Sequence, residues 1–212
     1  MRGILQAIAE RGITEVLHFT TNKGLLGILY SRVVLPRRRL PKNKLVEHVY
    51  MLNAEVRYDP EWTDYVNLSI GRINTRFFDI ASGKWHRDKD LWWCILSFSS
   101  VILTHEGVVF TTTNNAYNDV VERASGLEGF DGMYAGDVTE WPGRVLHRQP
   151  DLPAAYPTCP QAEVLYPGPL STDYLQRVYV VSDLHQDIAY AQAEAIDHRN
   201  IETVVDPSVF QG

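Results

Sequence analysis

Apolar residues recur in short runs along the chain, and each run predicts one strand or one face of a helix. The strongest run is WWCILSF at residues 92–98, which is nearly continuous and therefore predicts a buried strand. EVLHFT at 15–20 and YVNLSI at 65–70 combine β-branched, aromatic and alternating residues, and they predict two more strands. Shorter strands are predicted at 108–112, 163–166, 177–181 and 203–205.

Helices are predicted at residues 5–11, 23–30, 115–123 and 187–198. The helix at 23–30 has Thr21 or Asn22 as its expected N-cap, and its leucines and isoleucine form the buried side. Two prolines interrupt residues 32–44, and glycines and acids fill residues 129–142, so both segments are predicted as loops. The chain shows neither a steady βαβ alternation nor a repeat or linker, which favours one α+β domain over residues 1–212.

Charge is distributed unevenly along the chain. The formal net charge is −6, which counts mildly against a nucleic-acid partner because such proteins are often basic. Residues 32–44 nevertheless contain six basic side chains and no acidic one. A local basic segment on an acidic protein can bind phosphate in a salt-dependent way.

Targeting, membrane and metal signals are weak. The N-terminal apolar stretch carries charges and lacks a cleavage pattern, and no run reaches the roughly 18 apolar residues that span a bilayer. We therefore expect a cytoplasmic protein without a membrane segment. Cys94 and Cys159 match no metal or redox spacing, so we expect two reduced, buried thiols and no metal.

Four polar residues interrupt otherwise apolar strands, namely His18, Asn67, Ser69 and Glu163. Any one of them could be a hydrogen-bonded core or edge residue. Glu163 is the most informative, because burying an unpaired carboxylate is costly and rare. Gly-rich phosphate loops, HExxH, paired CxxC and GxSxG are all absent, so the common nucleotide-binding and hydrolase sites lack support.

Three segments, in this order, resemble the DarT family of DNA ADP-ribosyltransferase toxins. HFTTNKGLLGIL at 18–29 resembles the opening motif, where a strand ending in His-x-Thr runs into a helix. QAEVLY at 161–166 resembles the late strand that carries the catalytic glutamate. Between them, VRYD at 56–59 and YVNLSI at 65–70 resemble the middle of the family, where an arginine precedes a strand containing serine. The resemblance implies an ADP-ribosyltransferase fold with central split mixed or antiparallel sheets flanked by helices.

The resemblance also implies NAD⁺ as a consumed substrate and Glu163 as the main catalytic residue. A carboxylate in a water-poor site can stabilise the positive charge that develops on the ribose as nicotinamide leaves, and can accept a proton from the nucleophile. Arg57 is the expected second catalytic residue, although Arg37, Arg38, Arg39 and Arg72 compete for that role. The implied NAD⁺ contacts are His18, Phe19, Thr20, Asn22, Leu26, Tyr65, Asn67 and Ser69.

The acceptor implied by the resemblance is a base in single-stranded DNA, because a base inside a duplex cannot be reached. The expected DNA contacts are Arg37, Arg38, Arg39, Lys42 and Lys44, and the expected stacking residues are Tyr50, Tyr58, Trp62, Tyr65 and Trp85. The segment YVNLSIGRIN resembles the guanine-modifying branch of the family more than the thymine-modifying one, which implies guanine as the target base. The resemblance further implies an antitoxin partner, DarG, whose macrodomain removes ADP-ribose, and a role in phage defence.

Two other functions stay open. One is an ADP-ribosyltransferase that acts on RNA or protein. An exposed apolar patch near Glu163 would favour protein as the acceptor. The other is a non-enzymatic nucleic-acid-binding module, in which Glu163 would be salt-bridged or exposed and far from His18.

Overall fold

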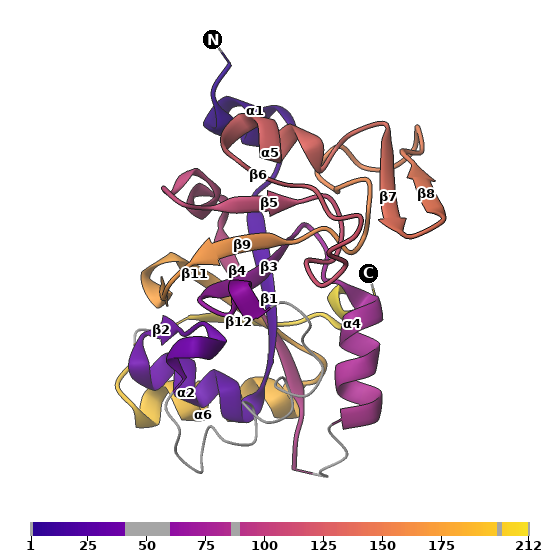
Figure 1. Ribbon diagram of the computed structural model, residues 1–212. Helices are drawn as coiled ribbons and strands as arrows, with labels where there is room; N and C mark the ends of the chain where they lie inside the picture. Colours follow the sequence, from indigo (N-terminus) through magenta and orange to yellow (C-terminus); the bar gives the residue numbers. More distant parts are fainter. Residues whose placement is uncertain (1, 41–59, 86–89, 199–200, 212) are drawn as a thin grey trace.

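An eight-stranded mixed sheet is the centre of the molecule (Figure 1). The computed structural model describes residues 2–40, 60–85, 90–198 and 201–211. Across the sheet the strands run in the order β12 (Glu202–Val205), β11 (Leu175–Val180), β4 (Trp93–Ser99), β1 (Glu15–Thr21), β3 (Tyr65–Ile70), β9 (Val164–Pro167), β5 (Val109–Thr111) and β6 (Arg123–Ser125). Neighbouring strands are antiparallel except for the parallel pair β11 and β12. The predicted α+β class with a mixed sheet is confirmed.

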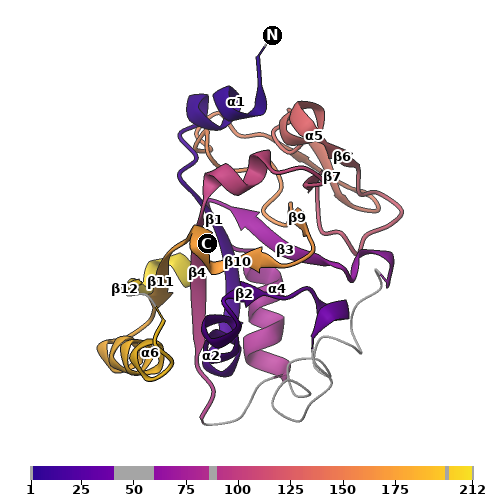
Figure 2. The same ribbon diagram turned by 90° about the vertical axis from the view of Figure 1, so that its left-hand side faces the viewer.

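The helices gather in three places around this sheet. Figure 1 shows α1 (Ile4–Glu10) beside α5 (Gly126–Gly132) at one end and α2 (Asn22–Ser31) beside α6 (Asp183–Ala195) at the other. α4 (Thr75–Ile80) stands apart from both pairs in Figure 1, and Figure 2 shows it away from α1, α5 and α6. None of the helices in the described ranges is long and apolar enough to cross a bilayer.

Two apolar cores lie on opposite faces of the central strands. Successive side chains of a strand point to opposite faces, and on β1 the buried Val16 belongs to the larger core while Leu17 belongs to the smaller one. The larger core includes the buried sides of α1, α2, α5 and α6. The smaller core is closed by Phe78 of α4 and by Phe210 near the C-terminus.

Two small sheets complete the fold. β2 (Val33–Val34) pairs with β10 (Leu170–Ser171), and β7 (Asp137–Trp141) forms a hairpin with β8 (Arg144–His147). The prediction of loop for residues 32–44 is therefore wrong at β2, and a short 3-10 turn covers Arg37–Arg39. The paired strand β10 lies far along the chain, so local sequence carries no sign of this pairing.

Two further predictions of secondary structure are wrong. Residues 115–120 form turns instead of a helix and Arg123 already belongs to β6, because the Asn114 side chain accepts the Ala116 N–H locally at 2.9 Å, which competes with helical bonding. Residues 129–142 contain most of α5 and all of β7 instead of a loop. Gly129 is helical, and a Cβ there would stand 2.0 Å from the Ala124 carbonyl oxygen, so this glycine permits close packing and does not break the helix.

The remaining predicted elements are confirmed with small shifts at their ends. The strand at 65–70 has the predicted bounds, and Thr21, not Asn22, caps α2 by accepting the Gly24 N–H at 3.2 Å. α6 begins at Asp183 rather than at residue 187, because the Ser182 hydroxyl caps it. Cys94 and Cys159 are buried free thiols, as expected.

Candidate active site

Glu163 lies directly before β9 with only 8% of its surface exposed. Thr111 of β5 fixes its backbone: the Thr111 N–H donates to the Glu163 carbonyl at 2.9 Å, and the Glu163 N–H donates to the Thr111 hydroxyl at 3.0 Å. The carboxylate oxygen Oε2 accepts the buried Asn115 N–H at 2.9 Å and the Asn67 amide at 3.1 Å. Hydrogen bonds to a charged group are the strong ones, so this carboxylate is held in one orientation.

β1 and β3 pair over a short distance only. Their ladder consists of Val16 with Ile70 and Leu17 with Ser69, whereas β1 pairs with β4 along all seven of its residues. Beyond Leu17 the two strands no longer pair, although both belong to the same sheet. The expected split is therefore present as a local interruption within one connected sheet.

His18 bridges this interruption. Its Nδ1 lies 3.0 Å from the Asn67 carbonyl oxygen on β3. A carbonyl only accepts, so Nδ1 carries the proton in this contact. His18 and Glu163 are consequently two hydrogen bonds apart, joined through the backbone and the side chain of Asn67.

The Phe19 peptide groups point into the same interruption. The Asn22 N–H bonds the Trp92 carbonyl at 2.9 Å at the end of the β1–β4 ladder. Along an antiparallel strand, the N–H and C=O groups of successive residues point alternately to the two neighbouring strands. Because Asn22 points toward β4, Phe19, three residues earlier, points its N–H and C=O toward β3. Phe19 has no paired residue there. Its ring lies in the smaller core, 5.4–5.8 Å from the rings of Phe78 and Trp93, and this packing fixes the backbone.

Ser69 and Tyr65 share the Asn67 side of β3, because side chains two apart on a strand face the same way. Leu68 pairs with Val164, so Ser69 stands one position further, opposite Glu163. Ser69 is 9% exposed. β3 thus places Asn67 and Ser69 beside the carboxylate, with Tyr65 further along the same face of the strand.

A chain of contacts leads from β3 to the loop that donates to Glu163. The rings of Tyr65 and Trp62 lie 5.0 Å apart, and the Arg123 guanidinium lies 5.3 Å from the Trp62 ring centroid. Arg123 donates to both the side-chain and the main-chain oxygen of Asn115 at 2.7 Å. Trp62, expected as a stacking residue for DNA, therefore helps to support the Asn115 loop.

The opening of α2 is tied to a neighbouring segment by the Asn22 side chain. The Asn22 side chain donates to the Asp90 carbonyl at 3.0 Å and accepts the Trp92 N–H at 3.4 Å. These bonds tie the start of α2 to the segment before β4. Leu26 is 39% exposed on α2, and Thr20 is half-buried on the His18 side of β1.

The basic segment carries less free charge than its sequence suggests. Arg39 forms a two-pronged ion pair with Asp64 at 2.6 and 2.7 Å, which lowers the pKa of the Asp64 carboxyl. Arg38 is exposed and Arg37 is half-buried. The predicted residues Arg57, Lys42, Lys44, Tyr50 and Tyr58 and the side chain of Trp85 lie outside the described residues.

Sequence reasoning missed the polar residues behind Glu163. Thr111, Asn115 and Arg123 come from the run TTTNNAYNDVVER, whose first residues end a predicted strand and whose residues 115–123 are predicted as a helix. Gln161 donates to the buried Glu140 carboxylate at 3.0 Å and so anchors the residues before Glu163 to β7. The only signal in the sequence was the unusual density of threonine and asparagine after residue 110. Within the described ranges, no three His, Cys, Asp or Glu residues are placed to hold a metal.

The fold is that of known ADP-ribosyltransferases. The chain is similar to Thermus sp. 2.9 DarT in complex with carba-NAD⁺, with 15% identity and a TM-score of 0.63 over 92% of this chain and 97% of that chain. Similarity to Thermus sp. 2.9 DarT in complex with ADP-ribosylated ssDNA has 16% identity and a TM-score of 0.62, over 93% and 96%. Thermosipho africanus DarTG in complex with ADP-ribose matches at 17% identity and a TM-score of 0.56, over 93% of this chain and 51% of that longer one.

The sequence itself identifies the family. The family model described as "ssDNA thymidine ADP-ribosyltransferase, DarT" matches residues 17–211. The chain therefore belongs to the DarT family of NAD-dependent single-stranded DNA ADP-ribosyltransferases. No protein of curated function matches the chain in sequence.

Proposed function

We propose that this chain transfers ADP-ribose from NAD⁺ to a base in single-stranded DNA, with Glu163 as the main catalytic residue. The observation that carries the proposal is the connection from His18 through Asn67 to the buried Glu163, across the interruption between β1 and β3. This connection brings together the two residues that are furthest apart in the sequence motifs. Glu163 and His18 have little reason to meet in a protein that only binds nucleic acid.

The residues around the interruption fit NAD⁺. The Phe19 N–H and C=O suit the carboxamide of nicotinamide, whose carbonyl oxygen accepts and whose NH₂ group donates. The His18 ring and the Thr20 hydroxyl lie on the face of β1 opposite to the Phe19 ring. Both can form hydrogen bonds with ribose hydroxyls. Ser69 and Tyr65 border the Glu163 side, and we keep Leu26 as a predicted contact on α2. We assign Asn22 to holding this strand end in place.

Glu163 performs the chemistry in this proposal. Its carboxylate lies in a largely buried site, where a fixed negative charge stabilises the positive charge that develops on the ribose more strongly than in water. The hydrogen bonds from Asn67 and Asn115 end on the same oxygen, Oε2, so the carboxylate is oriented before substrate binds. The same group can accept the proton that the attacking base releases. Arg57 is the proposed partner for the diphosphate, because a guanidinium pairs with phosphate oxygens in two-pronged fashion.

The test is incubation of the purified protein with NAD⁺ and short single-stranded oligonucleotides, followed by mass spectrometry of the DNA. The expected result is a mass gain of one ADP-ribose that Glu163→Gln abolishes. NAD⁺ consumption with unmodified DNA would instead favour RNA or protein as acceptor. Intact NAD⁺ and unmodified DNA would refute the proposal.

The target base is tested in the same experiment. The segment YVNLSIGRIN favours guanine, while the family description names thymidine. Matched oligonucleotides that contain thymine without guanine, or guanine without thymine, separate the two. Modification of only the thymine series would refute the guanine preference and leave the enzymatic proposal intact.

We also propose that the chain is a toxin neutralised by a DarG partner whose macrodomain removes ADP-ribose from DNA. The support is family membership and the similarity to the protein called DarTG. Induced expression in bacteria should stop growth, Glu163→Gln should not, and co-expression of a DarG macrodomain should restore growth. Unimpaired growth with active protein present would refute the toxin role.

A further inference from the structure

β3 ends in a turn that holds an arginine with no countercharge. Arg72 is half-buried, and its Nε is fully buried without a hydrogen-bond partner. No carboxylate of the described residues forms an ion pair with it. Burial is the main cause that lowers the pKa of its guanidinium, and the nearby Arg148 acts in the same direction. An uncompensated, partly buried charge is costly to a fold, and a bound anion would offset that cost.

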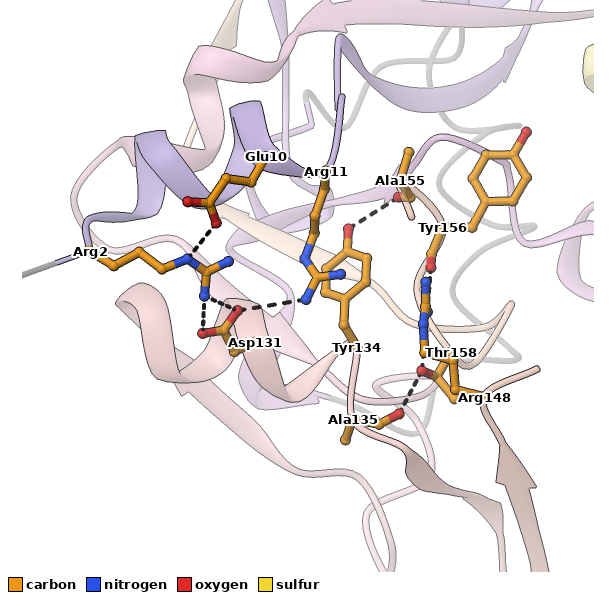
Figure 3. A network of polar contacts seen from close by, with 10 residues as sticks. All are labelled: Arg2, Glu10, Arg11, Asp131, Tyr134, Ala135, Arg148, Ala155, Tyr156 and Thr158. Atoms are coloured by element: carbon orange, nitrogen blue, oxygen red, sulfur yellow. Dashed lines mark hydrogen bonds and ion pairs between the residues drawn. The ribbon is translucent and has the colours of Figure 1, made fainter. Parts of the chain in front are cut away.

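The surroundings of Arg72 are rigid. Gly71 has φ +72°, and a Cβ there would stand 2.7 Å from the Tyr156 ring, so the turn lies directly against that ring. The Arg72 guanidinium lies 5.2 Å from the centroid of the same ring. Tyr156 is in turn fixed by Arg148, which donates to its carbonyl at 2.8 Å, as Figure 3 shows. Arg148 is thus used by the fold, while Arg72 is held in place with its charge unmatched.

A second arginine stands four residues further on. Arg76 of α4 is exposed, and its guanidinium lies 4.7 Å from the Trp141 ring centroid on β7. It too forms no ion pair with a described carboxylate. Its neighbour on the ring, Arg144, is instead neutralised by Glu140 at 2.8 Å.

Both arginines are linked to the surroundings of the Glu163 carboxylate through neighbouring residues. Arg72 follows Ser69, the residue opposite Glu163, by three positions. Arg76 contacts Trp141, which adjoins the Glu140 that anchors Gln161, two residues before Glu163. A strand whose base reacts at Glu163 would carry its phosphates past this surface.

We propose that Arg72 and Arg76 bind backbone phosphates of the single-stranded DNA that is modified at Glu163. This inference rests on the proposed function. It replaces part of the DNA path predicted for the basic segment, where Asp64 already neutralises Arg39. The β3–α4 turn and the β7–β8 hairpin then form the acceptor side of the site.

The experiment measures binding of a fluorescent single-stranded oligonucleotide by anisotropy, without NAD⁺, over a salt series. Each phosphate contact contributes about 0.7 to the slope of log affinity against log salt for single strands. Arg72→Gln and Arg76→Gln should each reduce the slope by about that amount, which corresponds to roughly fivefold weaker binding near 0.1 M salt. The double variant should lose both contributions.

Arg177→Gln is the matched control, because it removes the same charge on β11, beyond β1 and β4 in the sheet. Its slope should equal that of the wild type. Arg38→Gln tests the basic segment: a reduced slope there, with unchanged slopes for Arg72→Gln and Arg76→Gln, would overturn the inference.

Thermal unfolding distinguishes a binding role of Arg72 from a structural one. Removing an unmatched charge should leave the midpoint within a few degrees of the wild type. A large loss of stability in Arg72→Gln would overturn the inference, because it would mean that the fold itself needs this charge. Because no NAD⁺ is present, failure of ADP-ribose transfer does not affect this readout. Conversely, transfer that persists in Arg72→Gln with an unchanged KM for the oligonucleotide would leave the proposed function standing and this inference refuted.

Discussion

Asn67 is the residue whose replacement tests the site most directly. Its amide donates to Glu163 Oε2 at 3.1 Å, while its backbone carbonyl accepts from His18 at 3.0 Å. Asn67→Ala removes the first bond and keeps the second, since the second uses the main chain. The carboxylate then retains only the Asn115 N–H of these two donors.

The size of the effect follows from the charge of the acceptor. A hydrogen bond to a charged group contributes about 1.5–3 kcal/mol. If the bond orients Glu163 in the transition state, this amounts to a fall in kcat/KM of roughly 10- to 100-fold. If it acted equally on bound substrate and transition state, kcat would stay constant and only KM would rise.

The assay is single-turnover and steady-state ADP-ribosylation of an oligonucleotide at several NAD⁺ concentrations. The control is Gln149→Ala, which removes a side-chain amide that donates to the His147 backbone carbonyl at an exposed position just after β8. That variant should match the wild type. A change of less than about threefold in both kcat and KM for Asn67→Ala, with the fold intact by circular dichroism, would refute the orienting role.

Three further predictions follow from buried or bonded groups. Arg123→Gln should lower kcat/KM at least about tenfold and reduce the thermal midpoint, because it frees the loop that donates to Glu163; unchanged kinetics would separate that loop from catalysis. Burial raises the pKa of the thiols of both Cys94 and Cys159, so a thiol reagent at mildly alkaline pH should label neither until denaturant is added; prompt labelling of the native protein would contradict their burial. Burial also lowers the pKa of His185 below its ordinary 6.5, so the unfolded state binds more protons and stability should fall as pH drops from about 7.5 to 5.5. Guanidinium unfolding midpoints should show a smaller fall in His185→Gln than in the wild type, and parallel pH curves would exclude this histidine.

The sequence singled out those residues of the candidate site that lie on strands. His18, Asn67 and Glu163 stood out because each is a polar residue in an apolar strand, and such residues need partners. Their strands form where the apolar runs predicted them. The apolar runs do not indicate the order of strands across the sheet. That order sets Glu163 opposite Ser69, although the two residues are far apart in the chain.

The residues that sequence reasoning missed depend on contacts of long range. Asn115 serves Glu163 through its backbone N–H, and any residue type offers that group. Arg123 acts only because turns bring Asn115 back to it. Arg39 shows the opposite error, since a carboxylate 25 positions away, Asp64, matches a charge that looked free. Pairing across such distances is decided by packing and not by local propensity.

The interruption between β1 and β3 shows how the fold sustains an incomplete ladder. Stopping a ladder leaves peptide groups without strand partners, and each unmatched buried group is costly. Two features offset that cost here: β4 pairs with β1 over its full length, and β9 pairs with β3 from Tyr65 to Leu68. β1 and β3 are thus each paired along their other edge, so the edges that face one another can stay unpaired while the sheet remains connected.

His18 and Phe19 have different roles at the interruption. His18 satisfies the Asn67 carbonyl, which would otherwise be the first group exposed by the missing ladder. Phe19 packs its ring against Phe78 and Trp93, so its peptide groups stay directed at the gap. A ligand that bonds those groups restores hydrogen bonds the sheet gave up, and no part of the backbone has to be reordered when it binds. Under the proposed function, the site for NAD⁺ is therefore already ordered during folding, and the interrupted ladder makes binding there both tight and oriented.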